Sequence, residues 1–308
     1  MLRVFIHKYF DGKVRTKQEL ALKVFNGVER TSLKVLSSSS AWFNIASDYN
    51  KELSFRMDLL NKHPDLYMYE VGFEQDIFLA LLKISRNLVA NYPLYFKFTD
   101  NGKFILNITT NKVYPLYSGD PLYTLGCLIP QDINILKINP KNPLKSTLVG
   151  SITLYPVDWT PEERLGFGLA YLHVKVPKWT VNYRAEVKSA FSNNLGNKYL
   201  YRTNIFVQVS NNLVRKSSKD YVKLLNNTVV TIKDLYLRRE FQVFTGVSDN
   251  LVIFSVESHI QPLSSLSFKD LNSLYSDFEA RDQRDLGYHQ FCFWGPILNK
   301  YILSLEKA

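Results

Sequence analysis

Cysteine is scarce in this chain of 308 residues, and long hydrophobic runs are missing from it. The two cysteines, Cys127 and Cys292, are far apart and lack metal-ligand spacing, which argues against a disulfide framework, a structural zinc site and a protein-bound iron–sulfur cluster. No window approaches about 18 uninterrupted apolar residues and no secretory signal is present, so we expect no transmembrane helix. These absences predict an intracellular protein of a reducing compartment, either the cytoplasm or the mitochondrial matrix.

Several catalytic motifs are also absent. The chain has no glycine-rich phosphate loop, no His-Glu-x-x-His pair and no Gly-x-Ser-x-Gly elbow, which disfavours the common nucleotide-binding and hydrolase classes. Histidine remains as a candidate metal ligand, and the chain contains His7, His63, His173, His259 and His289. For each of these taken alone, a surface or hydrogen-bonded core role is more frequent than metal ligation.

Basic residues exceed acidic ones and give the chain a formal net charge of +10. Such a charge is compatible with nucleic acid, an anionic membrane, an acidic partner protein or a basic compartment. A local cluster consists of Arg215, Lys216, Lys219 and Lys223, but no RNA- or DNA-binding motif accompanies it. We therefore interpret the cluster as a solvated loop and disfavour nucleic acid as a partner.

A serine run, Ser37–Ser40, divides the chain. Residues 1–40 hold eight Lys/Arg against three Asp/Glu and predict a basic N-terminal extension. Its basic and apolar start resembles a mitochondrial targeting segment weakly, and an ordinary extension explains it equally well. The main body, residues 41–308, is predicted to form a single large domain.

The main body alternates between helical and strand patterns. Apolar residues at helical spacing predict helices at residues 53–60, 76–91, 183–196 and, after a capping Ser267, 268–278. β-Branched and aromatic runs predict strands at residues 151–157, 204–209, 228–232, 241–245 and 251–256. The last run is apolar except for Ser255, as expected when both faces of a strand are covered. The sequence therefore predicts an α+β fold in which helices flank one central antiparallel sheet.

His173 differs from the other histidines in its setting. Thr160, with Pro161 and Glu163 after it, predicts a short capped helix immediately after Trp159. Two glycines end this helix, and the chain then runs extended, with His173 opposite its apolar neighbours or at a turn that leads to Pro177. Aromatic residues make up 14% of the chain and could wall a flat cofactor. A neutral imidazole held in such a pocket is what five-coordinate haem iron requires.

The stretch from Asp158 to Pro177 resembles the Trp-x-Pro…Gly…Ile-His-x-Pro-Val-Pro signature of the haem-dependent oxidative N-demethylase α-subunit family. Further blocks resemble that family in the same order along the chain. They are Trp42 with Asp48-Tyr49, Arg56 and Leu59-Leu60; Asn91-Tyr-Pro93 with Phe96; Asn107 with Thr109; Pro130-Gln131-Asp132; Arg202-Thr-Asn204; and Arg238-Arg-Glu-Phe-Gln242. The resemblance extends from about Trp42 to Leu263.

The resemblance implies a PAS-like sheet that holds haem b and uses O2 to demethylate a small secondary amine such as dimethylamine. It also implies that electrons come from NADPH through separate flavin and iron–sulfur subunits, so a reductase partner is expected. His173 is the implied axial metal ligand, and Arg238, Trp159 and Arg202 are the implied cofactor-binding residues, with Arg238 pairing with a haem propionate. Glu240 and Gln242 are the implied catalytic residues, with Glu240 holding a cationic amine.

Three residues depart from the family pattern. Phe241 replaces its second Arg, Gln131 its first acid and Ile205 its Trp, and these changes bear on substrate specificity and on catalysis. An alternative is therefore a non-catalytic PAS-like protein that binds haem or another ligand, as a sensor or an assembly protein. Nucleic-acid binding through the basic surface is the third hypothesis.

Overall fold

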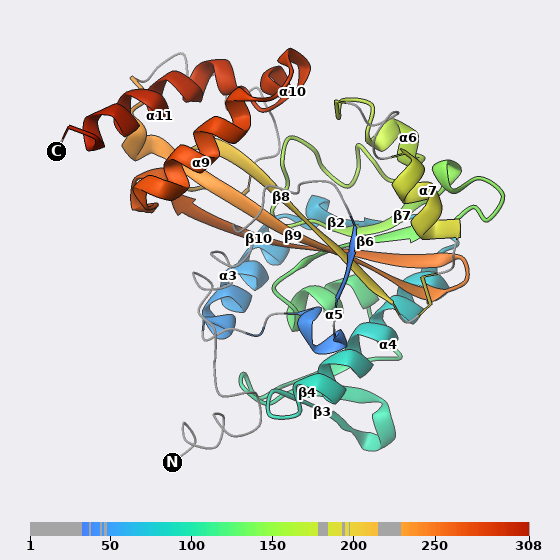
Figure 1. Ribbon diagram of the computed structural model, residues 1–308. Coiled ribbons are helices and arrows are strands. Elements are labelled where there is room, and N and C mark those ends of the chain that lie inside the picture. The colour runs from blue at the N-terminus through green and yellow to red at the C-terminus, as the bar shows by residue number, and fades with distance from the viewer. Residues whose placement is uncertain are drawn as a thin grey trace.

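The structure is a computed structural model that describes residues 33–36, 38–43, 45, 48–177, 184–192, 195–196, 198–214 and 229–307. These residues form one domain with a long antiparallel sheet and helices packed against it (Figure 1), which confirms the predicted α+β class. The likeness to PAS domains stays a prediction. Most of the predicted extension, together with His7 and the basic cluster at 215–223, lies outside the described residues.

The central sheet has seven strands in the order β1-β8-β9-β10-β6-β7-β2. Their bounds are β1 Lys34–Val35, β2 Tyr67–Tyr69, β6 Asp132–Lys137, β7 Thr147–Ile152, β8 Tyr199–Val209, β9 Leu235–Ser248 and β10 Leu251–Pro262. Asp249 and Asn250 form the tight turn that joins β9 to β10. Because β1 pairs with β8, residues 34–35 belong to the sheet, although the sequence assigned them to the extension.

A second, smaller sheet corrects the expectation of a single sheet. It contains β3 Phe96–Thr99, β4 Phe104–Asn107 and β5 Lys112–Pro115, all paired antiparallel. The turn between β3 and β4 uses Asp100, Asn101 and Gly102, which all have positive φ. Asp, Asn and Gly tolerate this conformation best, so the local sequence explains the hairpin.

The helices pack around the central sheet (Figure 1). Their bounds are α3 Tyr49–Lys62, α4 Glu74–Asn91, α5 Pro121–Leu128, α6 Leu169–Leu172, α7 Arg184–Ser192, α9 Phe268–Glu279, α10 Gln283–Tyr288 and α11 Phe291–Leu305. Short 3-10 helices are η1 Ser39–Ala41, η2 Pro64–Leu66, η3 Asp100–Gly102, η4 Pro143–Lys145, η6 Ile232–Asp234 and η7 Leu263–Ser265. In the described part of the chain, no helix combines the length and the apolar character needed to cross a bilayer.

The strand register divides the side chains of the central sheet between two faces. The core face presents Val243 and Ile253 to a cluster built from α3, α4 and α5, and Leu237 to a second cluster built from α9 and α11. The opposite face, here called the cavity face, presents Phe244 and Leu136 to α6 and α7. Period-two alternation therefore separates two sets of side chains with different surroundings.

Several predicted elements are confirmed. Helices α3 and α4 cover the predicted segments at 53–60 and 76–91, and β8, β9 and β10 contain the strands predicted at 204–209, 241–245 and 251–256. At α9 the Oγ atom of Ser267 accepts the N–H of Asp270 at 3.2 Å, as the capping pattern predicts. Helix α7 lies within the segment predicted at 183–196, of which residues 183, 193 and 194 are not described.

Two strand predictions are wrong in part, and in both cases a carboxylate binds the backbone. Strand β7 stops at Ile152 instead of Val157, and the Asp132 carboxylate accepts the N–H groups of Leu154 at 3.0 Å and Tyr155 at 3.1 Å. The strand predicted at 228–232 is irregular at 229–231, and η6 follows. There the Asp234 carboxylate accepts the N–H of Thr231 at 2.9 Å. These bonds replace ladder bonds.

Candidate functional site

The segment after Trp159 forms a turn, not the predicted helix. The Glu163 carboxylate accepts the N–H of Thr160 at 3.1 Å, so part of the predicted capping box is present. The turn stops because Gly166 has a φ of +77°, which ends helical geometry, and its N–H binds the Leu148 carbonyl in β7 at 2.8 Å. The guanidinium of Arg164 stacks on the half-buried Trp159 ring at 4.8 Å.

His173 lies at the C-terminal end of α6, so the predicted extended run through 172–176 is wrong. Helix α6 begins after Gly168, whose carbonyl accepts the N–H of Leu172 at 3.1 Å. A turn follows, in which the Val176 N–H binds the His173 carbonyl at 2.9 Å. This agrees with the other predicted geometry, a turn that leads to Pro177.

The His173 imidazole has a defined orientation and charge. Its Nδ1 atom lies 2.8 Å from the Leu169 carbonyl oxygen, so Nδ1 carries the hydrogen and, in the neutral ring, Nε2 carries the lone pair. Burial, helped by the positive charges of Arg202 and Arg164, lowers the pKa of His173 to about 4, although the bond to the Leu169 carbonyl acts in the opposite direction. The ring is therefore neutral near pH 7, as a metal-ligating imidazole must be.

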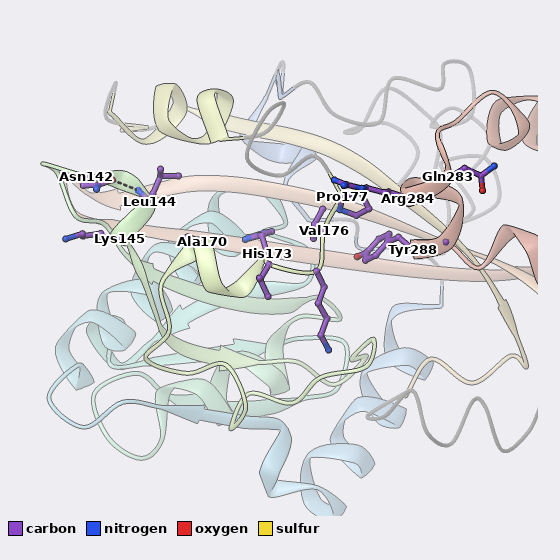
Figure 2. A pocket seen from close by; sticks show the side chains of 13 residues that line it. Asn142, Leu144, Lys145, Ala170, His173, Val176, Pro177, Gln283, Arg284 and Tyr288 are labelled. Carbon is purple, nitrogen blue, oxygen red and sulfur yellow. Dashed lines mark hydrogen bonds between the residues drawn. The ribbon is translucent and has the colours of Figure 1, made fainter.

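His173 lines a cavity of about 790 Å³ between three segments that are distant in sequence (Figure 2). The lining residues come from η4 and its flank, from α6 and the turn after it, and from α10: Asn142, Leu144, Lys145, Ala170, His173, Val174, Lys175, Val176, Pro177, Gln283, Arg284, Gly287 and Tyr288. The volume lies in the range of roughly 300–1,000 Å³ that is typical of cofactor sites. Lys145, Lys175 and Arg284 make this lining positively charged, and none of the lining residues that the structure describes is acidic.

Four of the other predicted site residues form a hydrogen-bonded chain on β8 and β9, here called the strand network. Arg202 Nε donates to Gln242 Oε1 at 2.6 Å, Gln242 Nε2 to Glu240 Oε2 at 3.0 Å, and Arg238 Nε to Glu240 Oε1 at 3.2 Å. The alternation of β9 puts residues 238, 240 and 242 on the cavity face, and the register puts Arg202 opposite Gln242.

Arg238 is bound by protein groups around its guanidinium. Beyond Glu240, its Nη2 donates to the Tyr155 carbonyl at 2.6 Å and to Ser258 Oγ at 3.1 Å, and its Nη1 donates to the Leu213 carbonyl at 3.0 Å. Only 1% of the residue is exposed. Arg238 therefore ties two loops to β9 and holds the Glu240 carboxylate in place.

The structure brings the strand network close to the cavity, although its members do not line the cavity. Burial raises the pKa of the Tyr288 hydroxyl and the negative charge of Glu240 raises it further, whereas the positive charges of Arg164 and Arg202 lower it. The positive charge of Arg202 also lowers the pKa of His173. Arg202 and Glu240 are thus electrostatically linked to the cavity, while Trp159 and Arg238 do not line it.

The cavity adds residues that the sequence reasoning missed, above all Tyr288, Lys145, Lys175 and Arg284. The Asp282 side chain accepts the N–H groups of Arg284 and Asp285, each at 3.0 Å. As an N-cap residue, Asp282 could have predicted the start of α10 from the sequence. Nothing in the local sequence indicates that α10 packs near η4 and α6. The site could therefore not be completed from sequence.

The three departures from the family pattern do not line the cavity. The Phe241 ring packs on Tyr201 of the core face at 5.5 Å, and Ile205 packs against the cluster of α9 and α11. Gln131 Nε2 donates to Glu257 Oε2 at 3.2 Å, and Glu257 lies opposite Phe241 in the ladder. These substitutions change the core face and its edge and leave the His173 cavity as described.

Among the residues that the structure describes, no group of three or more His, Cys, Asp or Glu could hold a bare metal ion. A porphyrin supplies four of the iron ligands itself and needs only an axial side chain, so the single His173 suits that kind of metal centre. Of the other described histidines, His259 binds Glu257 at 2.7 Å and His289 packs on Phe278 at 5.2 Å. His63 ends α3.

One family model matches the chain, over residues 33–296, and its description is "Haem-dependent oxidative N-demethylase, alpha subunit-like". The match covers far more than half of the 308 residues and includes His173, the strand network and the first turns of α11. No curated protein matches the chain significantly.

Proposed function

The chain belongs to the haem-dependent oxidative N-demethylase, alpha subunit-like family, and on this premise we propose that it is a haem-dependent oxidoreductase. The proposed reaction is the O2-dependent oxidation of a small secondary amine such as dimethylamine. The electrons would come from NADPH through a separate reductase that carries flavin and iron–sulfur centres. This expectation follows the family resemblance, and the chain itself has no motif for those centres.

The observation that carries the proposal is the bond between His173 Nδ1 and the Leu169 carbonyl oxygen at 2.8 Å. This bond fixes the ring and its tautomer, in which Nε2 carries the lone pair, and such a bond to Nδ1 is the arrangement that supports histidine ligands of metals. Because burial and the nearby arginines keep the ring neutral, no proton competes for Nε2 near pH 7. His173 is therefore the residue that would hold the iron of haem b, through Nε2.

The cavity supports haem in two further respects. Its volume of about 790 Å³ and its lining by Leu144, Ala170, Val174 and Val176 suit a large apolar ring. Lys145, Lys175 and Arg284 on the same lining would pair with the two propionates. When bound, haem would supply the redox-active iron at which O2 reacts.

The strand network has a positioning role in this proposal. Arg238, which the resemblance assigns to a propionate, has four protein acceptors and instead holds Glu240. Gln242 links Glu240 to Arg202, whose positive charge helps to keep His173 neutral. Glu240 would favour a cationic amine through its negative charge rather than through direct contact, because only 7% of it is exposed. Trp159 supports the turn before α6 through Arg164.

An absorption spectrum tests the proposal. The wild-type protein, expressed with adequate haem, is expected to show a Soret band, and His173→Ala is expected to lose it or to shift the ferric and ferrous bands. His63→Ala is the matched control, because His63 ends α3 away from the cavity lining. A colourless wild-type protein contradicts the proposed function, and an unchanged His173→Ala spectrum contradicts the ligand.

A second candidate function is haem or ligand binding without turnover, as in a sensor or an assembly protein. The hydrogen bonds of Glu240 favour this candidate, because its two carboxylate oxygens already accept hydrogen bonds from Arg238 and Gln242 within the protein. A bound haem that gives no NADPH-dependent formaldehyde from dimethylamine with a competent reductase would support this candidate. Turnover under the same conditions would support the enzyme.

A further inference from the structure

Tyr288 lines the cavity from the side opposite α6. It is the last residue of α10, and its side chain reaches from that helix toward the turn that carries His173, with the hydroxyl at the leading end (Figure 2). Tyr288 is 40% exposed, and the three cations of the lining are exposed as well. Tyr288 is the hydroxyl-bearing residue that α10 contributes to this lining.

The packing under α10 fixes the position of this phenol. The Tyr288 ring meets the His289 ring edge to face at 5.0 Å, and the His289 ring in turn packs on Phe278 at 5.2 Å and on Phe206 at 5.5 Å. Trp294, which is fully buried, donates its indole N–H to the His289 carbonyl at 2.8 Å. The cluster of α9 and α11 thus anchors the residue beside Tyr288, and a binding group on a rigid support is more selective.

The surroundings of Tyr288 keep it protonated. Burial and the negative charge of Glu240 raise the pKa of the hydroxyl, and the positive charges of Arg164 and Arg202 offset only part of this effect. A protonated phenol offers one O–H donor. Three cations stand on the described part of the cavity lining, so such a donor suits an acceptor that is anionic.

We propose that Tyr288 donates a hydrogen bond to small anionic ligands that enter the cavity beside His173. This inference rests on the proposed function, because it takes His173 to be the axial ligand of haem. It names a binding residue outside the sequence blocks that carry the family resemblance, and it assigns the ligand class as small oxygen- or halide-type anions.

The test compares fluoride with imidazole as ligands of the ferric holoprotein, by absorption titration. Fluoride accepts a hydrogen bond from a nearby donor, whereas imidazole binds iron through nitrogen and needs no such donor. Tyr288→Phe is expected to weaken fluoride binding roughly tenfold or more, the effect of losing one hydrogen bond to an anion. Its imidazole affinity is expected to stay within about twofold of the wild-type value. Tyr171→Phe, at a residue that is 58% exposed and does not line the cavity, is the matched control.

The outcomes separate this inference from the proposed function. A wild-type protein without a Soret band overturns both. A normal Soret band with equal fluoride affinity in Tyr288→Phe and wild type overturns only the role of Tyr288. Equal losses of fluoride and imidazole affinity in Tyr288→Phe also overturn that role, because they would show a general change of the cavity. A selective loss of fluoride affinity supports it.

Discussion

The strand network and the cavity lining differ in how their polar groups are used. In the network, Arg202, Arg238, Glu240 and Gln242 bind one another and nearby backbone groups, and the ladder of β8 and β9 sets their spacing. The cavity lining comes from η4, from the end of α6 and from α10, with charged groups such as Lys175 and Arg284 at exposed positions. The difference indicates that the strands supply support and that the ends of short helices meet the ligand.

The largest expected effect is on the network. Glu240→Ala in the haem-free protein should lower the free energy of unfolding by about 3–5 kcal/mol, because it leaves the guanidinium of Arg238 buried without its carboxylate. Urea denaturation measures this. The conservative Glu240→Gln keeps an acceptor and should cost less. If both variants unfold like wild type, the strand network does not stabilise the fold, and the proposed difference between the network and the cavity lining is wrong.

The next effect is the loss of stability at acidic pH that His173 causes. The folded-state pKa of about 4 lies below the ordinary value of 6.5, so between these values the unfolded chain binds a proton that the folded one does not. Stability therefore falls as the pH is lowered through this window, by about 3 kcal/mol from this residue. Haem-free His173→Ala should lose less stability than wild type between pH 6.5 and pH 4. Parallel losses in urea denaturation at both pH values would argue against a buried, neutral ring.

Arg202 connects the two regions, and its replacement should have a smaller effect. Arg202→Met removes the 2.6 Å bond to Gln242 and should lower the free energy of unfolding by about 1.5–3 kcal/mol. It also removes a positive charge that acts on His173, so the pKa of His173 should rise. An NMR titration of the haem-free variant measures the pKa. No change would mean that the network and the cavity are electrostatically separate.

The smallest stability effect is expected at the cavity lining. Lys175→Gln and Arg284→Gln replace exposed residues and should change the free energy of unfolding by no more than about 0.5 kcal/mol. Both should speed the loss of haem to an acceptor protein, more strongly at low salt, because they remove partners of the propionates. Lys300→Gln, an exposed α11 position away from the lining, is the control. Equal rates in all three variants would exclude these residues as propionate partners.

Elements that depend on local patterns could be predicted from the amino-acid sequence alone. The helical spacing of apolar residues predicted α4, the largely apolar run at 251–256 predicted β10, and Ser267 predicted the start of α9. The sequence also selected His173 among the histidines of the chain, through the motif around it. Such signals are readable because they depend on neighbours in the chain.

The way in which these parts meet depends on contacts between residues that are far apart in the chain. Asp132 ends β7 by binding Leu154 and Tyr155 across more than 20 residues of chain, and no local pattern indicates that contact. The cavity exists because η4, α6 and α10 pack together, which brings Leu144, His173 and Tyr288 to one place. Whether a polar side chain binds a ligand or a neighbouring residue depends on such long-range packing. Glu240 is an example: the family resemblance implies that it binds the substrate, whereas its carboxylate accepts hydrogen bonds from Arg238 and Gln242.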